Sequence, residues 1–312
     1  MAAAVRARGS IYTELLGAKP IINAGGNLTF LGGSTPSPEV QRIMSEANSS
    51  FIPQDELAEA AGRHVAELLS APAAMVTAGC ASGLTLAAAA AMAGDSPTFI
   101  QQLPDTTGMK NELVIQSNQR YHYDRALEFS GAKLVEYGGS SGAMATATEL
   151  AAAISPATAA VVYVAGGSRN GGASYIDKGP VMDFDEMVAV ATKHGIPVIV
   201  DAAVEVFPLS HMTQWINRGA CVQVMAMKYI NAPQSTGVAV GTEQFIHHMR
   251  LHTFQAYETP HFGDQAFGAG EGEFVEFNNA WHVRGIGRTH KITRSDIVVP
   301  SLFNTYPGRV RF

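Results

Sequence analysis

The chain has 312 residues, of which 46% are hydrophobic and 15% are charged, the proportions of an ordinary globular protein. Its formal net charge of −6, without any dense run of Lys and Arg, excludes an electrostatic footprint for nucleic acid or for an anionic membrane surface. We therefore expect a protein that acts on small molecules.

The number of cysteines and the character of the apolar segments indicate the cellular compartment. Cys80 and Cys221 are too few for a disulfide framework, and no apolar segment follows the N-terminal arginines to make a signal peptide. The stretch 71–94 carries no charge, but it is mostly alanine and is interrupted by proline and glycine, so we do not expect it to span a membrane. These features predict a cytoplasmic protein.

Taken in chain order, the sequence divides into three parts. Residues 1–50 are predicted to form an extended arm and a helix over 38–48, and a second helix follows over 54–69. Residues 51–250 are predicted to form a large domain. The regular pattern fades in a C-terminal segment, 251–312.

Within the large domain, short apolar runs alternate with helical patterns. The runs cover residues 73–77, 112–116, 132–137, 159–166, 196–203, 221–227 and 235–241. Helical patterns between them include residues 81–93, 147–154, 183–195 and 212–219. Strands that are apolar throughout and separated by helices predict an α/β fold of three layers, with helices on both faces of a mostly parallel, seven-stranded sheet.

An aspartate and a lysine follow two of these runs. Asp201 ends the run IPVIV and Lys228 follows the run CVQVMAM, so one strand-helix-strand unit would bring both side chains to the same edge of the sheet. Pyridoxal phosphate requires such a pair, because the lysine forms an imine with it and the aspartate keeps its ring nitrogen protonated. A salt bridge, or a capping aspartate beside a solvated lysine, is the alternative.

The segment VTAGCASG, residues 76–83, adds a second signal. A strand that turns through small residues into a helix leaves free N–H groups at the positive helix end, where a phosphate can bind, and Ser82 adds a hydroxyl. The segment lacks the lysine of a P-loop and the glycine spacing of a dinucleotide-binding fold. Tight packing of the strand against the helix is the alternative.

Read together, VTAGCASGLTLAAAAAMAGD, GIPVIVDAAVEVFPL and KYINAPQSTGVAVG resemble the selenocysteine synthase-like branch of the fold type I pyridoxal-phosphate enzymes, in the aspartate aminotransferase superfamily. That branch includes D-glucosaminate-6-phosphate ammonia lyase. The resemblance covers most of residues 20–245 and implies pyridoxal 5'-phosphate as the cofactor. It also implies that residues 251–312 are a short remnant of the small domain.

The resemblance assigns cofactor roles to individual residues. Lys228 would bond the cofactor and act as the base at Cα, Asp201 would pair with the ring nitrogen, and Ala203 would pack on the ring. Gln119 stands where relatives have a histidine over the cofactor, and Tyr121 or His122 are possible substitutes. The predicted phosphate contacts are Gly79, Cys80, Ala81, Ser82, Ser235 and Thr236, the last two toward the neighbouring subunit.

The resemblance also implies a homodimer or larger homo-oligomer with active sites at the interface. The arm from Asn23 to Ser34 is then a candidate for closing the partner's site. Candidate substrate-binding residues are Asn23, Thr29, Glu205 and Arg288. Glu205 faces the ring edge or caps the following turn, and Arg288 binds the substrate's anion or lies on the surface.

The chain departs from its relatives just before the lysine. Met225, Ala226 and Met227 stand where many relatives have Ser-Gly-Gly, so one hydroxyl expected beside the phosphate is missing. His248 and His252 share a helical face at metal-ligand spacing, but no third ligand follows, and we expect no metal.

The predicted function is that of a pyridoxal-phosphate enzyme acting at Cα or Cβ of an amino acid or a 2-amino sugar acid. The resemblance favours α,β-elimination with release of ammonia, the lyase reaction. Racemisation, aldol cleavage, transamination and a non-catalytic protein of the same fold are the alternatives. The acidic chain disfavours a tRNA partner.

Overall fold

The computed structural model describes residues 11–139, 143–166 and 179–253, together with three later strands. The chain divides into two compact units, residues 1–252 and 253–312. In the second unit, an antiparallel sheet has the order β10 (His290–Ile292), β9 (Ala280–Arg284), β8 (Glu273–Phe277). The site considered below lies in the first unit.

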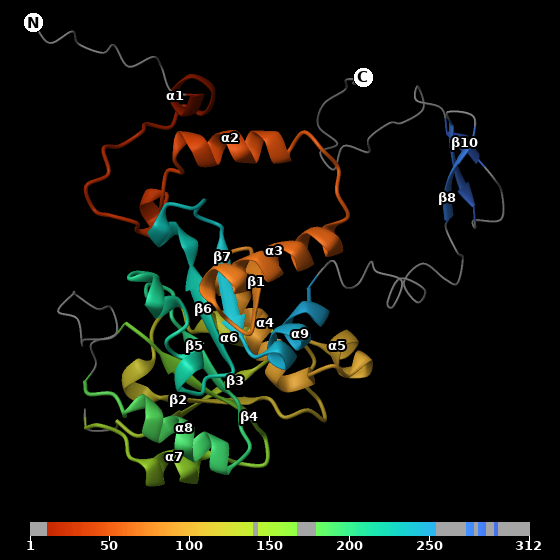
Figure 1. Ribbon diagram of the computed structural model, residues 1–312. Helices are drawn as coiled ribbons and strands as arrows, with labels where there is room; N and C mark the ends of the chain where they lie inside the picture. The colour runs from red at the N-terminus through yellow and green to blue at the C-terminus, as the bar shows by residue number, and fades with distance from the viewer. Residues whose placement is uncertain are drawn as a thin grey trace, which may run out of the picture. The chain divides into compact units, whose positions relative to one another are not determined.

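Seven strands of the first unit form one sheet (Figure 1). Their spatial order is β1 (Ala73–Thr77), β7 (Gly237–Gly241), β6 (Val222–Ala226), β5 (Val198–Asp201), β4 (Thr158–Val164), β2 (Glu112–Gln116) and β3 (Lys133–Tyr137). β7 runs antiparallel to β1 and β6, and all other neighbouring pairs are parallel. The predicted mostly parallel, seven-stranded sheet is therefore confirmed.

Helices lie on both faces of this sheet. The described helices are α1 (Ile11–Leu16), α2 (Pro38–Ala47), α3 (Gln54–Leu69), α4 (Cys80–Ala93), α5 (Pro97–Gln102), α6 (Arg125–Glu128), α7 (Ala147–Ala153), α8 (Phe184–Lys193) and α9 (Glu243–Leu251). Side chains of α3, α7 and α8 belong to one buried cluster, and those of α4, α6 and α9 belong to another. Figure 1 shows α7 and α8 side by side.

The strands separate the two clusters because successive side chains point to opposite faces. In β4, for example, Val161 packs into the first cluster and Val162 into the second. Both faces of the central strands are thus buried, which explains why these strands read as continuous apolar runs rather than as an alternating pattern. The prediction of three layers is confirmed.

The alanine-rich stretch 71–94 forms β1 and α4. α4 is largely buried, and its small side chains let it approach the sheet closely: a Cβ on Gly83 would lie 2.5 Å from Val224 Cγ1. Of the helices in the described part of the chain, none has the length and apolar character needed to cross a membrane.

The predicted helix over 212–219 is wrong. The connection from β5 to β6 contains two short 3-10 turns, η3 (Leu209–Met212) and η4 (Ile216–Arg218). The side chain of Gln223, near the start of β6, accepts hydrogen bonds from the backbone N–H groups of Trp215 and Ile216, which ties this segment to the sheet. The crossover keeps β5 and β6 parallel without an α-helix.

Candidate active site

The predicted cofactor residues gather along one edge of the large sheet. β1, β2, β5 and β6 run in the same direction, so their carboxyl ends share this edge, and antiparallel β7 begins there. Gly79 follows β1, Gln119 follows β2, Asp201 ends β5, and Lys228 follows β6. Asp201 and Lys228 belong to neighbouring parallel strands, as their order in the sequence predicted.

Lys228 is held inside the protein rather than on its surface. It lies in the 3-10 turn η5 (Met227–Ile230) and is only 8% exposed. Its Nζ donates a hydrogen bond to Thr29 Oγ1 at 2.6 Å. Burial lowers the pKa of the Lys228 amine, so a larger fraction of it is neutral and nucleophilic than for a solvated lysine.

The N-terminal arm lies against the lysine of its own chain. Besides Thr29, which begins the 3-10 turn η1 (Thr29–Leu31), Asn27 donates from Nδ2 to the Lys228 carbonyl at 2.8 Å. Ser34 donates to the Ala232 carbonyl, and Gln234 donates to the Thr29 carbonyl at 3.3 Å. The arm thus lies beside the lysine through four described hydrogen bonds, and its role in closing a partner's site stays a prediction.

Asn23 lies further out on the arm, where it stabilises a local turn. Its side chain accepts a hydrogen bond from the Gly25 N–H and donates one to the Gly26 carbonyl. Of the two arm residues predicted to bind substrate, only Thr29 has a hydrogen bond to Lys228 among the described contacts.

Asp201 is a buried carboxylate surrounded by donors. It is 3% exposed, and its Oδ1 accepts from the Ala203 N–H at 3.1 Å and from Cys80 Sγ at 3.8 Å. The phenol of Tyr121 donates to Oδ2. Burial raises the pKa of the Asp201 carboxyl, and the hydrogen bonds from Tyr121, Ala203 and Cys80 oppose that rise by stabilising the charged form.

The start of α4 has the form of an anion site. Gly79 has φ 90° and ψ 167°, a conformation that only glycine adopts readily, and no side chain caps the helix at this residue. The first N–H groups of an α-helix have no partner within the helix. Ser82 donates its hydroxyl to the Ala78 carbonyl, while Cys80 and Ala81 form the first turn.

The turn before β7 lies close to the start of α4. A Cβ on Gly237 would lie 2.5 Å from the Gly79 carbonyl carbon, and a Cβ on Gly79 would lie 3.9 Å from the Ser235 carbonyl oxygen. Thr236 accepts through its carbonyl from the Met227 N–H at 2.9 Å, which fixes the turn beside η5. Ser235 and Thr236 thus lie near the start of α4 in their own chain.

Gln119 carries a buried polar atom whose hydrogen-bonding capacity is unused. Gln119 is 1% exposed and donates from Nε2 to the Val164 carbonyl at 2.7 Å. Its Oε1 has no hydrogen-bond partner among the described residues. Because a buried acceptor without a donor is costly, this oxygen at the sheet edge is suited to a donor supplied by a ligand or water.

Glu205 and the methionines before Lys228 make contacts other than those expected of cofactor or substrate groups. The Glu205 carboxylate accepts hydrogen bonds from Gln214 Nε2 at 2.6 Å and Trp215 Nε1 at 2.8 Å, so its described contacts hold the β5–β6 connection together. The side chains of Met225 and Met227 pack in the first buried cluster, on the face of the sheet away from α4. Arg288 lies outside the described residues.

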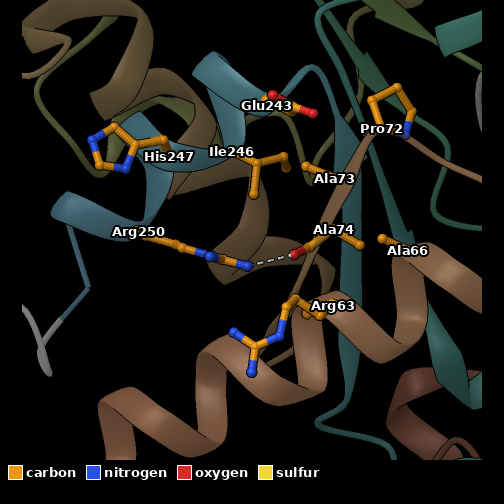
Figure 2. A pocket seen from close by; sticks show the side chains of 10 residues that line it. Arg63, Ala66, Pro72, Ala73, Ala74, Glu243, Ile246, His247 and Arg250 are labelled. Atoms are coloured by element: carbon orange, nitrogen blue, oxygen red, sulfur yellow. Dashed lines mark hydrogen bonds between the residues drawn. The ribbon is translucent and has the colours of Figure 1, made fainter.

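A pocket of about 240 Å³ lies at the opposite end of β1, between β1, α3 and α9 (Figure 2). Arg250 reaches across it to donate to the Ala74 carbonyl at 3.1 Å. None of the predicted site residues lines this pocket. Within the described segments, no group of three or more His, Cys, Asp or Glu side chains could hold a metal ion.

Known proteins similar to this chain include an ammonia lyase. D-Glucosaminate-6-phosphate ammonia lyase from Salmonella typhimurium (strain 14028s / SGSC 2262) is 33% identical over 242 residues, which cover 76% of this chain and 62% of that protein. A solved structure of D-glucosaminate-6-phosphate ammonia lyase matches 78% of this chain and 63% of its own with a TM-score of 0.70 and 30% identity. The chain has the fold of the type I pyridoxal-phosphate enzymes, and its resemblance to the ammonia lyase is confirmed.

A second curated relative has a different name. The 5'-C-glycyluridine monooxygenase-decarboxylase of a Streptomyces species is also 33% identical, over 226 residues that cover 70% of this chain and 54% of that protein. No protein-family model matches the chain. The chain thus spans between about half and two thirds of the length of the curated relatives it matches.

The sequence alone did not predict two contributions to this site. From the sequence, no role is predicted for Asn27, which lies within the arm, and Tyr121 is predicted only as a possible substitute for a histidine over the cofactor. Asn27 binds the backbone of Lys228, and Tyr121 binds the carboxylate of Asp201. No local pattern predicts these contacts, because each joins residues far apart in the chain.

Proposed function

We propose that this chain binds pyridoxal 5'-phosphate through Lys228 and catalyses an α,β-elimination with release of ammonia from an amino acid or a 2-amino sugar acid. The observation that carries this proposal is the buried pair of Lys228 and Asp201 at the ends of neighbouring parallel strands, beside the uncapped start of α4. The 33% identity to an ammonia lyase supports the choice of reaction.

The residues present fit the cofactor. The start of α4, with Gly79 through Ser82, offers N–H groups to a phosphate, and Ser235 and Thr236 lie near it. Asp201 offers a carboxylate for a protonated ring nitrogen, with Ala203 beside it. Gln119 Oε1 offers an acceptor that no described residue uses.

When bound, pyridoxal phosphate supplies an electron sink that stabilises negative charge at the substrate's Cα. The chain's own groups position the reaction and move the proton. Lys228 Nζ, made less basic by burial and oriented by Thr29 Oγ1, accepts the proton from Cα. Asp201, whose charged form is favoured by hydrogen bonds from Tyr121, Ala203 and Cys80, would hold the proton on the ring nitrogen.

The substrate contacts are also proposals. Thr29 is the described arm residue nearest the reacting amine, and Arg288 is our candidate for binding the substrate's anionic group. We assign Glu205 a supporting role, because Trp215 and Gln214 already occupy its carboxylate. We further propose residues 51–250 as the cofactor-binding domain, with 1–50 as the arm and helix and 251–312 as a C-terminal segment.

The test is covalent labelling of one lysine. Purified protein incubated with pyridoxal phosphate should develop a visible absorption band, and reduction with borohydride should leave a pyridoxyl group on the peptide that contains Lys228. Lys228→Ala should lose both signals, whereas Lys193→Ala, which removes an exposed lysine on α8, should keep them. A wild-type protein that takes up no cofactor would overturn the proposal.

The reaction type needs a separate measurement. Release of ammonia and a 2-keto acid should appear with one member of a panel of amino acids and 2-amino sugar acids, and Lys228→Ala should lower that rate by at least about 10²-fold. Oxygen uptake should be measured on the same panel, because the Streptomyces relative is named as a monooxygenase. Oxygen-dependent turnover without ammonia would reject the elimination and keep the cofactor.

We also propose a homodimer in the cytoplasm. Ile22 and Phe51 are fully exposed and Phe30 is 79% exposed, and α1 and α2 contain no buried residue, so the N-terminal segment offers an apolar surface to a second copy. Cys80 and Cys221 are free thiols, as expected in a reducing compartment.

The dimer is tested by sedimentation velocity. The wild-type chain should sediment as a dimer at micromolar concentration, and Phe51→Asp should shift it to the monomer, because a charge on that surface opposes association. Glu67→Asp on α3 is a conservative control that should leave the dimer intact. A monomeric wild-type protein would contradict the dimer and leave cofactor binding to be judged separately.

A further inference from the structure

Tyr121 hydrogen-bonds to Asp201 from the loop after β2, a strand that is not adjacent to β5. It follows the 3-10 turn η2 (Ser117–Gln119) after β2, and β4 lies between β2 and the strand that carries Asp201. Its phenol nevertheless donates to Asp201 Oδ2. The ring is partly buried and packs against the second cluster, whose members include side chains of α4.

The backbone and neighbours of Tyr121 hold it in this position. The Tyr121 N–H donates to Asp124 Oδ2 at 3.1 Å, and Arg120 binds the same oxygen. The rings of His122 and Tyr123 contact the Tyr121 ring edge-on, with centroids 5.9 and 5.8 Å away. A side chain fixed in so many ways can orient the group to which it donates.

The bond leaves room for a ligand on the same carboxylate. A carboxylate has about four acceptor positions, two on each oxygen. The Ala203 N–H takes one position on Oδ1, the Cys80 thiol shares its single hydrogen between Oδ1 and the Val224 carbonyl at 3.6 Å, and Tyr121 takes one position on Oδ2. One position on Oδ2 is left over, so a donor from a ring nitrogen can bind Asp201 while the phenol stays in place.

We propose that Tyr121 is a positioning residue for Asp201: its phenol fixes the carboxylate so that the remaining Oδ2 position faces the ring nitrogen of bound pyridoxal phosphate. This inference rests on the proposed function, since it needs the cofactor that Lys228 and Asp201 would hold. The phenol acts only through Asp201.

The charge balance supports this role. Burial raises the pKa of the Asp201 carboxyl, and the Tyr121 hydrogen bond counteracts that rise. Burial and the nearby carboxylate raise the pKa of the Tyr121 phenol as well, so the phenol remains a donor. The charged form of Asp201 is the form that can keep a ring nitrogen protonated.

The experiment measures the dissociation constant of pyridoxal phosphate for wild type, Tyr121→Phe and Tyr123→Phe. Tyr121→Phe keeps the ring and removes the bond to Asp201, so we expect about 10-fold weaker binding, the effect of one hydrogen bond to a charged group. Tyr123→Phe removes the hydroxyl of a half-exposed neighbour and should bind as wild type does.

A second ligand separates positioning from a general structural role. A deaza analogue of pyridoxal phosphate carries C–H in place of the ring nitrogen and cannot bond to Asp201. With this analogue, Tyr121→Phe and wild type should bind equally, and in an Asp201→Asn background Tyr121→Phe should add no further loss. Equal weakening for both ligands would overturn the inference, because the phenol would then act on the fold and not through Asp201.

The outcomes distinguish this inference from the proposed function. A wild-type chain that binds neither ligand rejects the cofactor and the inference together. If Tyr121→Phe and the wild type bind pyridoxal phosphate equally tightly, only the role of Tyr121 is rejected. Thermal unfolding of each variant, measured without cofactor, confirms that the compared proteins are folded.

Discussion

Two buried ionisable groups, one near each end of α4, differ in the hydrogen bonds that surround them. At its start, Asp201 is buried but accepts hydrogen bonds from Tyr121, Ala203 and Cys80. At its end, His252 is buried beside Gly94, and its Nε2 has no hydrogen-bond partner among the described residues. The first group is equipped to carry charge, and the second is not.

The outcome at His252 follows from the relative size of the effects. His252 is the C-terminal cap of α9, and a helix C-terminus favours a cation by roughly 0.3–1 kcal/mol. Burial is the larger effect and lowers the pKa of His252 to about 4, while a hydrogen bond to the Gly94 backbone only partly opposes it. Three hydrogen bonds thus favour the charged form of Asp201, whereas at His252 one backbone hydrogen bond does not outweigh burial.

The largest expected effect is a dependence of stability on pH, caused by His252. Because His252 takes up a proton near pH 6.5 when unfolded but only near pH 4 when folded, the free energy of unfolding should fall as the pH drops through this window. The loss should reach about 3 kcal/mol at the lower end. Urea unfolding between pH 7 and pH 4, in the wild type and in His252→Gln, measures this loss.

His252→Gln should flatten the curve, since glutamine does not titrate. His64→Gln on α3 replaces an exposed histidine and serves as the matched control, with the wild-type slope expected. A His252→Gln curve that is as steep as the wild-type curve would mean that other groups cause the acid sensitivity.

We expect a smaller change in the free energy of unfolding when the glycines at the two ends of α4 are replaced. Gly79, with φ 90° and ψ 167°, and Gly94, with φ 56° and ψ −126°, both adopt backbone conformations that side chains disfavour. Gly79→Ala and Gly94→Ala should each lower the free energy of unfolding by about 1–3 kcal/mol. Only Gly79→Ala should also weaken binding of pyridoxal phosphate, because only that end faces the site.

Thermal unfolding and cofactor titration of both variants provide this comparison. Gly94→Ala controls for strain in the helix itself. Equal loss of cofactor affinity in the two variants would show that helix stability, rather than the geometry at Gly79, controls binding at the candidate phosphate site.

Much of this architecture was predictable because the strands are buried on both faces. Such strands appear as apolar runs, and each of the seven predicted runs overlaps one strand of the sheet. The antiparallel direction of β7 was also implicit: only residues 227–236 join it to β6, too few for the crossover that a parallel strand needs. The helix predicted over 212–219 does not form, because the backbone N–H groups of Trp215 and Ile216 bond to Gln223 and the local backbone bonds of the segment make only short turns.

The sequence by itself determined that a lysine and an aspartate follow neighbouring strands, next to a small-residue turn that opens a helix. Strand direction and crossover rules require those positions to share an edge. Only the tertiary structure decided which distant side chains complete the site: Thr29 at the amine, and Tyr121 at the carboxylate. Such contacts depend on how the arm and the loop after β2 return to the sheet edge, a path that packing determines and no local pattern encodes.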